Sequence, residues 1–428
     1  MTQLPFSRIR NLVLSAAVLL IAGGIGYQMG AHSVSLGVSG DHRVVVNTAP
    51  PAGNTVDFSL FWDVWDKLTK NYVDQKSINV QKLVYGAITG MVSAVGDPFT
   101  SFFPPQENQQ FKQDLGGAFE GIGAQLGMKD GRVIIVSPLR GQPAEAAGLK
   151  PNDIILKVDG ADTTGWTVEQ AVTKIRGPKG TKVTLTVLHT QSADKPVDIS
   201  IVRATITVPS VVWWVKSPNA VTEISGATGS ASIHATARIG YISLSRFGDN
   251  TNAEWDKAVS DLLADEQANG KIRGLVFDLR NNPGGYLEGA IYIASEFLRS
   301  GTVVSQVNSD GSRQDYPVER RGKLLDVPMV VLVNKGSASA AEIVSGALHD
   351  KQRAKLVGET TFGKGTVQTP FDLSGGAAVH ITTGKWLLPS GNSISQKGIT
   401  PDYVVALPDS PTPTQDTQLA KAIDLLLQ

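Results

Sequence analysis

The chain of 428 residues contains no cysteine. This absence excludes disulfide bonds, thiolate metal sites and a cysteine nucleophile. The six histidines form no H-E-x-x-H or similar ligand spacing, so we expect neither a metalloenzyme nor a cofactor. The chain also lacks an excess of either charge, because 39 lysines and arginines balance 39 aspartates and glutamates. A balanced chain is a poor candidate for nucleic-acid binding, which depends on basic contacts to phosphates.

The chain is too long for one ordinary domain, and we expect two or three. Hydrophobic residues make up 41% of it and charged residues 18%, which is typical of a globular protein. Nothing in this composition indicates disorder of the whole chain.

Residues 12–27 form a long apolar run, with Arg8 and Arg10 before it and no acidic residue up to its end. This pattern indicates an export signal. The run is slightly short of the roughly 20 residues that cross a bilayer comfortably, and no clear A-x-A cleavage site follows it. We favour an uncleaved anchor in residues 1–30, with the body outside the cytoplasm. The alternative is a cleaved signal and a periplasmic or secreted protein. Residues 31–55 are predicted to be a linker.

A serine, a lysine and a glutamine follow one another in residues 334–368. The apolar run at residues 327–333 predicts a buried strand before them. From Ser339 onward, apolar residues recur at helical spacing, so Ser339 and Ala340 are expected in the first turn of a helix. Backbone N–H groups are unpaired there and the helix dipole is positive. A serine hydroxyl that attacks a carbonyl at this position would find its oxyanion partly stabilised.

Lys364 stands between Gly363 and Gly365, where other backbone can approach it closely. A serine hydroxyl needs a base, and a lysine serves as one only when it is neutral. Burial lowers the pKa of a lysine and favours the neutral form. Considered alone, a serine at a helix start is more often a cap, and a lysine in a glycine-rich turn is more often solvated.

Residues 358–365 nearly match the phosphate-binding pattern G-x-x-x-x-G-K-[ST], but Gly365 occupies the last place. Residues 366–370 indicate a strand and a turn instead of the helix that such a loop requires. Nucleotide binding therefore remains a minor alternative.

The segment GSASAAE at residues 336–342, followed by FGKGTVQ at residues 362–368, resembles the carboxyl-terminal processing proteases. These tail-specific proteases are serine peptidases with a Ser-Lys-Gln site. The resemblance implies Ser339 as the nucleophile, Lys364 as the general base and Gln368 as the residue that orients the lysine. It also implies an endopeptidase that acts through an acyl-enzyme on proteins with exposed C-terminal tails. The resemblance covers about residues 56–405.

Residues 278–285 (DLRNNPGG) form a second informative motif. A strand that ends in such a tight turn leaves backbone N–H groups free, and these could complete an oxyanion hole with the Ala340 N–H. The resembled family places a glycine donor here, which implies Gly285 with Gly284 as its neighbour. Residues 225–236 echo the nucleophile motif, but no strand or matched lysine accompanies them. We therefore interpret them as an inserted loop and not as a site.

From about Phe111 the pattern changes to short strands and turns, which by composition is a small α+β module. Asp159-Gly160 predicts a hairpin, and residues 183–188 are expected to form the last strand. The order of its motifs resembles a protease-associated PDZ domain, assigned to residues 112–203. Those motifs are Gly121-Ile122-Gly123, the P-A-x-x-A-G-L pattern at residues 143–149, Asn152-Asp153, and Val158-Asp159-Gly160.

The PDZ resemblance implies capture of a peptide's C-terminus. The backbone N–H groups of Gly121, Ile122 and Gly123 would hold the carboxylate while the peptide adds as a strand. In the resembled family an arginine of this segment couples capture to the active site, and Arg176 is the candidate here. A surface arginine without that role is an equal alternative.

Residues 56–111 are expected to form a helical N-terminal segment with an aromatic stripe on its first helix, at Phe58, Phe61, Trp62, Trp65 and Tyr72. The stripe either packs on the body or joins two copies of the chain. Some members of the resembled family self-associate through this segment, which also contains a DPFT motif at residues 97–100.

Residues 204–405 alternate strands and helices, which predicts an α/β core, and residues 406–428 end in an amphipathic helix expected to pack on the body. The predicted fold is therefore a multidomain α+β and α/β protein, with a helical N-terminal segment, a PDZ domain and a Ser-Lys protease core. The predicted function is a membrane-attached serine endopeptidase. A catalytically silent PDZ scaffold or adaptor at the membrane is the alternative from another class.

Overall fold

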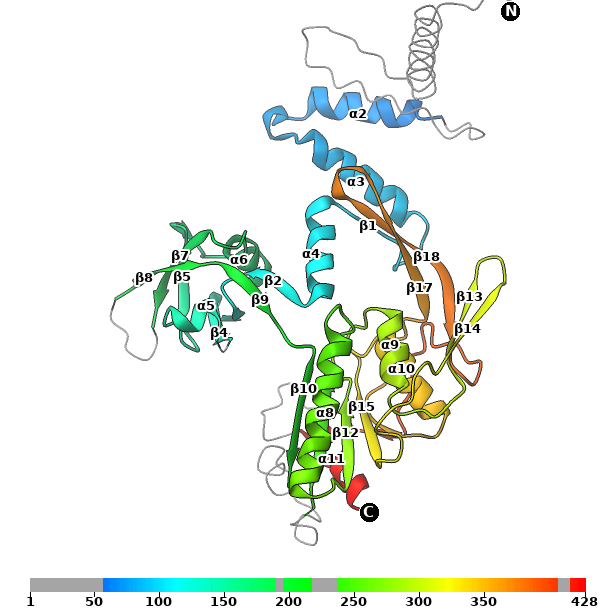
Figure 1. Cartoon of the computed structure of the whole chain (residues 1–428). Helices are drawn as coiled ribbons and strands as arrows, with labels where there is room; N and C mark the ends of the chain where they lie inside the picture. The colour runs from blue at the N-terminus through cyan, green and yellow to red at the C-terminus, as the bar shows by residue number, and fades with distance from the viewer. Residues whose placement is uncertain (1–56, 140, 190–194, 218–236, 407–415) are drawn as a thin grey trace, which may run out of the picture. The chain divides into compact units, whose positions relative to one another are not determined.

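The computed structural model describes residues 57–139, 141–189, 195–217, 237–406 and 416–428 (Figure 1). The predicted anchor, the linker and the 225–236 insertion lie outside these ranges. No helix inside them is long and apolar enough to cross a membrane. The chain divides into two compact units, Met1–Asn79 and Val80–Gln428, which we describe separately.

In the first unit, helix α2 (Ser59–Asn71) carries the aromatic stripe and is followed by the short 3-10 helix η1 (Gln75–Ser77). The aromatic rings of α2 contact one another, with the centroids of Phe61 and Trp62 5.0 Å apart. No residue of α2 is buried. The helix is confirmed, whereas its packing on the body or on a second copy stays a prediction.

The second unit begins with helix α3 (Val80–Ser93), strand β1 (Ser101–Phe103) and helix α4 (Pro105–Gly116). Helix α4 was not expected, and it crosses the boundary that the sequence suggested between residues 111 and 112. Its twelve residues contain few apolar side chains, so no helical periodicity was visible. A proline at its first position and Gly117 after its end, at φ +64°, delimit it as such residues commonly do.

The PDZ module is a sheet of order β3-β4-β5-β7-β8, with β6 paired to β5 (Figure 1). Asp159 and Gly160 both have positive φ, as the predicted hairpin requires. The expectation that residues 183–188 form the last strand was wrong, because β8 pairs antiparallel with β7 and β9 follows. The elements are β3 (Ala124–Lys129), β4 (Arg132–Pro138), α5 (Pro143–Ala146), β5 (Ile154–Val158), β6 (Ala161–Asp162), α6 (Val168–Ile175), β7 (Lys182–Leu188) and β8 (Val197–Val202).

A two-stranded ribbon leads into and out of this module. Strand β2 (Ala118–Gly121) pairs antiparallel with β9 (Ala204–Thr207), and the Val208 amide donates a hydrogen bond to the Gly117 carbonyl. The chain therefore enters and leaves the PDZ module at neighbouring points. Residues 204–207, which the sequence assigned to the protease core, belong to this ribbon.

A six-stranded sheet of order β10-β11-β12-β15-β16-β19 forms the centre of the body. All neighbouring strands are parallel except β10, which is an antiparallel edge. Buried runs such as LVF in β12 and MVVLV in β15 are typical of a sheet covered on both faces. The strands are β10 (Val211–Lys216), β11 (Ile239–Leu244), β12 (Gly274–Asp278), β15 (Met329–Val333), β16 (Lys355–Gly358) and β19 (Tyr403–Val404).

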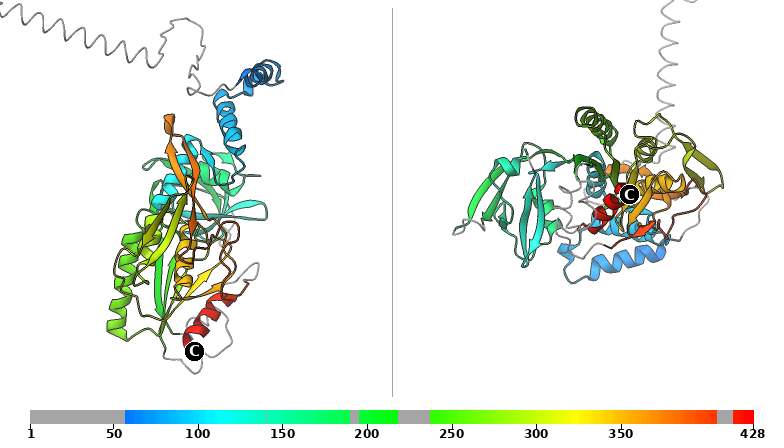
Figure 2. Two further views of the ribbon diagram at one scale, coloured as in Figure 1. Left: turned by 90° about the vertical axis from the view of Figure 1, so that its right-hand side faces the viewer. Right: turned by 90° about the horizontal axis from the view of Figure 1, so that it is seen from below.

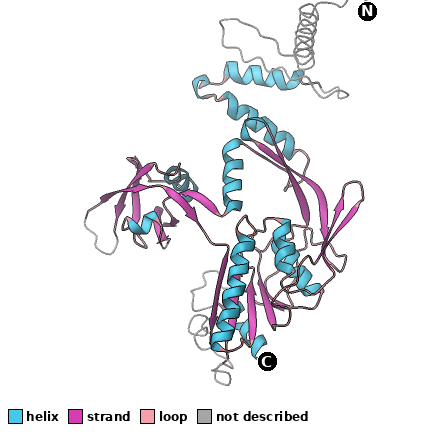
Figure 3. Cartoon of the chain, in the orientation of Figure 1, coloured by secondary structure: helices cyan, strands magenta, loops and turns pink. Residues whose placement is uncertain are grey.

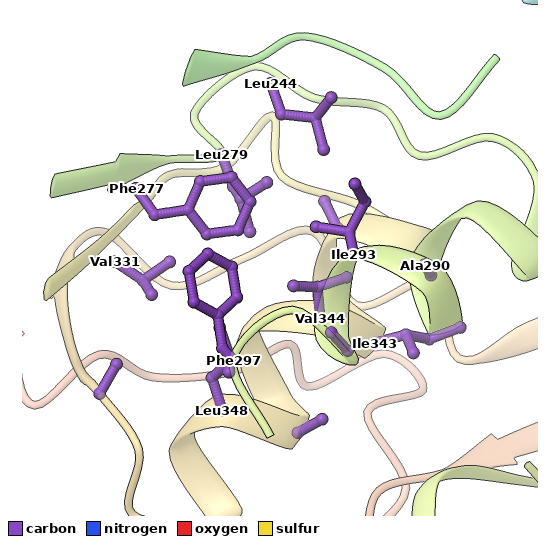
Figure 4. Close-up of a cluster of buried hydrophobic side chains, with 14 of the residues drawn as sticks. Leu244, Phe277, Leu279, Ala290, Ile293, Phe297, Val331, Ile343, Val344 and Leu348 are labelled. Atoms are coloured by element: carbon purple, nitrogen blue, oxygen red, sulfur yellow. The ribbon is translucent and has the colours of Figure 1, made fainter. Parts of the chain in front are cut away.

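Helices cover both faces of this sheet. Helices α8 (Thr251–Asn269), α9 (Leu287–Ala294) and α10 (Ala340–Asp350) share one apolar core with the sheet, part of which Figure 4 shows. Phe277 of β12 points into that core, whereas its neighbour Val276 points to the other face. There it meets helix α11 (Thr417–Leu427), drawn in red in Figure 2. The predicted packing of the C-terminal helix on the body is confirmed.

A second, antiparallel sheet lies beside the first and was not foreseen from the sequence. Its order is β1-β18-β13-β14, and β17 also pairs with β18, forming the long hairpin seen in Figure 3. The strands are β13 (Thr302–Asn308), β14 (Arg313–Pro317), β17 (Thr366–Asp372) and β18 (Ala378–Leu387). Lys364 lies just before β17, and Gln368 lies within it. The mixed α/β fold with a PDZ domain agrees with the sequence prediction.

Candidate active site

Ser339 lies between strand β15 and helix α10. Ala340 is the first residue of the helix and Ser339 is its N-cap, one position earlier than predicted. The backbone of Ser339 has φ +53° and ψ −116°, which is rare for a residue with a side chain. Such a conformation costs about 1–3 kcal/mol and persists only where its surroundings enforce it. Ala338 and Ala340 are buried on either side, while Ser339 itself is partly accessible.

The side chain of Glu342 holds this turn. It is fully buried, and one of its oxygens accepts hydrogen bonds from the amides of Ser339 and Lys364, both at 2.9 Å. The other oxygen accepts from the Thr361 hydroxyl at 2.5 Å and from the Gly363 amide at 2.7 Å. A single carboxylate therefore joins the backbone of the predicted nucleophile to the backbone of the predicted base.

Glu342 is a functional residue that was not predicted, although the sequence contains a signal for it. Serine at an N-cap with glutamate three residues later is the capping-box pattern, in which the glutamate accepts from the N-cap amide. The Ser339 amide makes this bond. The bonds to residues 361–364 have no local signal, since they join segments about twenty residues apart.

Other backbone segments pack closely against the glycines on either side of Lys364, as the sequence predicted. A Cβ atom on Gly365 would lie 2.4 Å from the Ser395 amide nitrogen, so only glycine fits there. The Lys364 Nζ lies 5.5 Å from the centroid of the Phe99 ring. Burial lowers the pKa of Lys364, whereas the nearby charges of Asp97 and Glu342 act in the opposite direction. Burial is the larger effect and favours the neutral amine that a base requires.

The same contacts argue against the nucleotide-binding alternative. A phosphate-binding loop needs free backbone amides, yet the amides of Gly363 and Lys364 already bind the Glu342 carboxylate. A strand follows the loop, where the nucleotide-binding pattern requires a helix.

Gln368 lies on β17 and turns its amide nitrogen toward two hydroxyls. Nε2 donates to Thr366 Oγ1 at 2.8 Å and to Thr382 Oγ1 at 3.1 Å. Ser339, Lys364 and Gln368 all line one cavity of about 1050 Å³. No hydrogen bond joins the three side chains to one another among the residues that the structure describes. The structure thus places the three residues on one cavity, but without the serine–lysine and lysine–glutamine hydrogen bonds that catalysis requires.

The 278–285 motif packs directly against the serine. The Gly284 amide donates to Asn282 Oδ1 at 2.9 Å, and a Cβ on Gly284 would lie 2.8 Å from the Ser339 Cβ. Within the described ranges, the amides of Gly285 and Ala340 donate no hydrogen bond, and Gly285 lines the cavity. These are the two donors that the sequence predicted for an oxyanion hole.

In the PDZ module, strand β3 is an edge strand that pairs only with β4, so its other edge is unpaired within the described part of the chain. Gly121 ends β2, where it is paired with Ala204. The carbonyls of Ile122 and Gly123 accept hydrogen bonds within the module, but among the described residues their amides donate none. Two of the three predicted carboxylate-binding amides therefore make no hydrogen bond among the described residues, and they precede a free strand edge, although both residues are buried.

Arg176 follows the last residue of α6. Its guanidinium lies 4.4 Å from the centroid of the Phe119 ring and 4.0 Å from the Asp114 carboxylate on α4. It lines the same cavity as Ser339, together with Phe119 and Asp114. Its position agrees with a coupling role but does not by itself require one.

Comparison with known proteins identifies the family. The family model described as peptidase family S41 matches residues 238–405, and the PDZ domain model matches residues 109–188. Carboxy-terminal processing protease CtpA of Bacillus subtilis is 38% identical over 385 residues, which are 89% of this chain and 75% of that relative. The chain belongs to the carboxy-terminal processing proteases.

Other comparisons agree with this membership. The carboxyl-terminal-processing protease of Synechocystis is 37% identical over 85% of this chain and 81% of its own length. A structure from Bacteroides fragilis described as an S41 protease has the same fold, with a TM-score of 0.53 at 16% identity over 85% of this chain and 96% of that chain. This carboxy-terminal processing protease is thus a serine peptidase with a PDZ domain, as its motifs predicted.

Proposed function

We propose that this carboxy-terminal processing protease cleaves protein substrates with Ser339 as nucleophile and Lys364 as general base, after its PDZ domain has captured their C-terminal tails. The observation that carries the proposal is the position of the Glu342 carboxylate. A single oxygen of this group accepts hydrogen bonds from the amides of both Ser339 and Lys364. Nucleophile and base thereby share one rigid support at the wall of one cavity.

In the proposed reaction, neutral Lys364 takes the proton of the Ser339 hydroxyl as its oxygen attacks the scissile carbonyl. The Gly285 and Ala340 amides donate to the oxyanion. The protonated lysine then gives its proton to the leaving amine, and an acyl-enzyme remains on Ser339. Water, deprotonated by Lys364, hydrolyses this ester and restores the serine. Because no hydrogen bond joins Lys364 to Ser339 in the described structure, the lysine side chain must first turn toward the serine.

Substrate capture would use the free edge of β3. An extended tail adds there as an antiparallel strand, and its carboxylate accepts from the Ile122 and Gly123 amides. Arg176 would transmit the capture to the catalytic cavity that it also lines. We further propose that residues 12–27 anchor the protein in a membrane with the body outside the cytoplasm, and that α2 supports self-association.

The test compares wild type with Ser339→Ala on an unfolded protein whose C-terminus is small and apolar, and on the same protein ending in two aspartates. We expect wild type to degrade the first substrate and to spare the second. Ser339→Ala should bind the first substrate without cleaving it. Binding without cleavage by wild type would support the scaffold alternative, and cleavage by Ser339→Ala would exclude the serine as nucleophile.

A further inference from the structure

The turn of the DPFT motif lies beside the catalytic segment, although more than 250 residues separate them in sequence. Asp97 Oδ2 accepts hydrogen bonds from the hydroxyls of Thr100 and Thr382. The Thr382 amide in turn donates to Thr100 Oγ1 at 3.1 Å. Thr382 lies on β18, directly opposite Gln368 of β17. A continuous hydrogen-bonded chain therefore runs from Asp97 through Thr382 to Gln368.

The direction of this chain is fixed by counting protons. An ionised carboxylate only accepts, so Thr382 must give its single hydroxyl proton to Asp97. Toward Gln368, the Thr382 oxygen can then only accept, and Gln368 must present its NH2 group. The second proton of that NH2 goes to Thr366. Both amide protons are committed, and the Gln368 Oε1 is left as an acceptor without a partner in the described structure.

The orientation of this carboxamide matters for a lysine base. A neutral amine must point its lone pair at the serine proton, and it can donate an N–H to an acceptor beside it. Gln368 Oε1 is an acceptor without a hydrogen-bond partner among the described residues, and Gln368 lines the same cavity as Lys364. In the flipped carboxamide, the NH2 group would instead donate to the lysine lone pair and block the base.

We propose that Asp97 and Thr382 are positioning residues that keep the Gln368 oxygen, and not its NH2 group, turned toward Lys364. This inference rests on the proposed role of Lys364 as base. It gives the DPFT turn a part in catalysis without contact to the substrate. The competing explanation is a structural one, in which Asp97 and Thr100 only fasten the α3–β1 turn to β18.

A double-mutant cycle separates the two explanations. Gln368→Ala should lower kcat by about 10- to 100-fold, less than the loss of Ser339 or Lys364, because glutamine transfers no proton. Thr382→Val keeps the shape but removes the hydroxyl, and we expect about a tenfold loss of kcat with KM unchanged. In the Gln368→Ala background the same change should have no further effect, because the residue that it orients is gone.

Two controls accompany the cycle. Thr382→Ser keeps the hydroxyl and should retain kcat within about twofold. Thr383→Val removes the hydroxyl that is paired with Thr369 at 2.7 Å on the same two strands. Neither hydroxyl is a hydrogen-bond partner of the Gln368 side chain in the described structure. Thr383→Val is expected to leave kcat unchanged. Equal losses for Thr382→Val in both backgrounds, or a wild-type rate for Thr382→Val alone, would overturn the proposal.

Asp97→Asn adds a second readout. The new side-chain amide could donate to the Thr382 hydroxyl, which would then be free to donate toward Gln368. The Gln368 carboxamide would no longer be held in one orientation, so kcat should fall. Asp97, Glu342 and His380 are the titratable groups whose charges interact with Lys364. Loss of the Asp97 charge should lower the pKa of Lys364 and move the acid limb of the kcat profile to lower pH. Thr382→Val should leave that limb in place, and a limb that moves equally in both variants would contradict the positioning role.

Lys364→Ala, measured in parallel, distinguishes failure of the positioning role from failure of the lysine as base. If Lys364→Ala is inactive and the cycle shows no coupling, the positioning role fails while the lysine base stands. If Lys364→Ala remains active, the lysine base itself is wrong and the positioning role falls with it.

Discussion

The nucleophile side and the base side of the site are held in different ways. Ser339 is fixed in a rare backbone conformation by a buried carboxylate, at the start of a helix whose apolar residues are buried in the core. The Lys364 backbone shares that support, but its amine has no hydrogen bond in the described structure and contacts the face of Phe99. The nucleophile is therefore held by hydrogen bonds of its own backbone, whereas the amine of the base is held only by packing in the described structure.

The largest expected effect comes from removing the base. Lys364→Ala should lower kcat by about 10³-fold or more, the upper part of the range for general-base catalysis. Lys364→Arg should lose as much, because a guanidinium does not deprotonate near neutral pH. Rates on a fluorogenic peptide, with circular dichroism to confirm folding, provide the measurement. Appreciable turnover by the arginine variant would show that Lys364 acts through its positive charge and not as a general base.

Glu342→Gln tests whether the Glu342 carboxylate holds the backbone of both the nucleophile and the base. Its amide would present an NH2 group where two protein donors now bind, and an unsatisfied buried group costs about 1–3 kcal/mol. We expect kcat to fall about 100-fold and the melting temperature to fall as well.

Glu254→Gln is the matched control for this change. Glu254 Oε2 accepts from the Ser210 amide and hydroxyl and from the Val211 amide, and none of these three residues lines the cavity that Ser339 lines. This variant should lose stability and keep kcat. Parallel loss of activity in both variants would indicate that general destabilisation is the cause.

Local patterns predicted the parts of this site that depend on neighbours in sequence. The apolar run of β15 and the helical spacing after Ser339 predicted the strand, the turn and the start of the helix to within two residues. The glycines around Lys364 predicted its close backbone contacts. Each of these features follows from a few adjacent residues.

Pairings between distant segments could not be predicted in the same way. The antiparallel sheet joins β1, β13 and β18, whose register no local pattern encodes. The Asp97–Thr382–Gln368 chain requires three separate elements to meet. Helix α4 was missed for a different reason, because its mostly polar composition hid the helical period. Its terminal proline and glycine would have revealed it.

Phe99 covers the Lys364 amine and should set the pH dependence of kcat. Since burial depresses the pKa of Lys364, the neutral fraction and hence kcat should rise as pH increases through that lowered pKa. Phe99→Ala admits water to the amine, so its pKa should rise and the acid limb should move to higher pH. Below the limb, kcat follows the neutral fraction of Lys364, so raising its pKa by about one lowers kcat about tenfold.

Phe99→Leu should act in the opposite direction. It keeps an apolar cover but removes the ring face, which stabilises the charged form by about 0.5–1 kcal/mol at exposed sites and by more where the amine is desolvated. The limb should therefore move to lower pH by about 0.5, measured as kcat from about pH 5 to 10 in buffers of constant ionic strength. Movement in the same direction for both variants would show that burial alone sets the pKa.

The smallest expected effect concerns how the PDZ module acts on Lys364. A tether only raises the local substrate concentration, so it would change KM and leave kcat alone. A gate changes the population of aligned Lys364, so occupancy of the PDZ groove changes kcat itself. Arg176 lies on the wall of the catalytic cavity, and the β2–β9 ribbon is the module's connection to the body. We therefore favour a gate.

The measurement is kcat on a peptide too short to reach both sites, with and without a second peptide that binds only the PDZ groove. A gate predicts a change of about two- to tenfold in the intact protein, corresponding to about 0.4–1.4 kcal/mol. Deleting residues 118–207 and joining Gly117 to Val208, which are already hydrogen-bonded neighbours, should abolish the response. Arg176→Ala should weaken it while groove binding persists. If the second peptide leaves turnover unchanged in the intact protein, the module is a tether, and Arg176 has no coupling role.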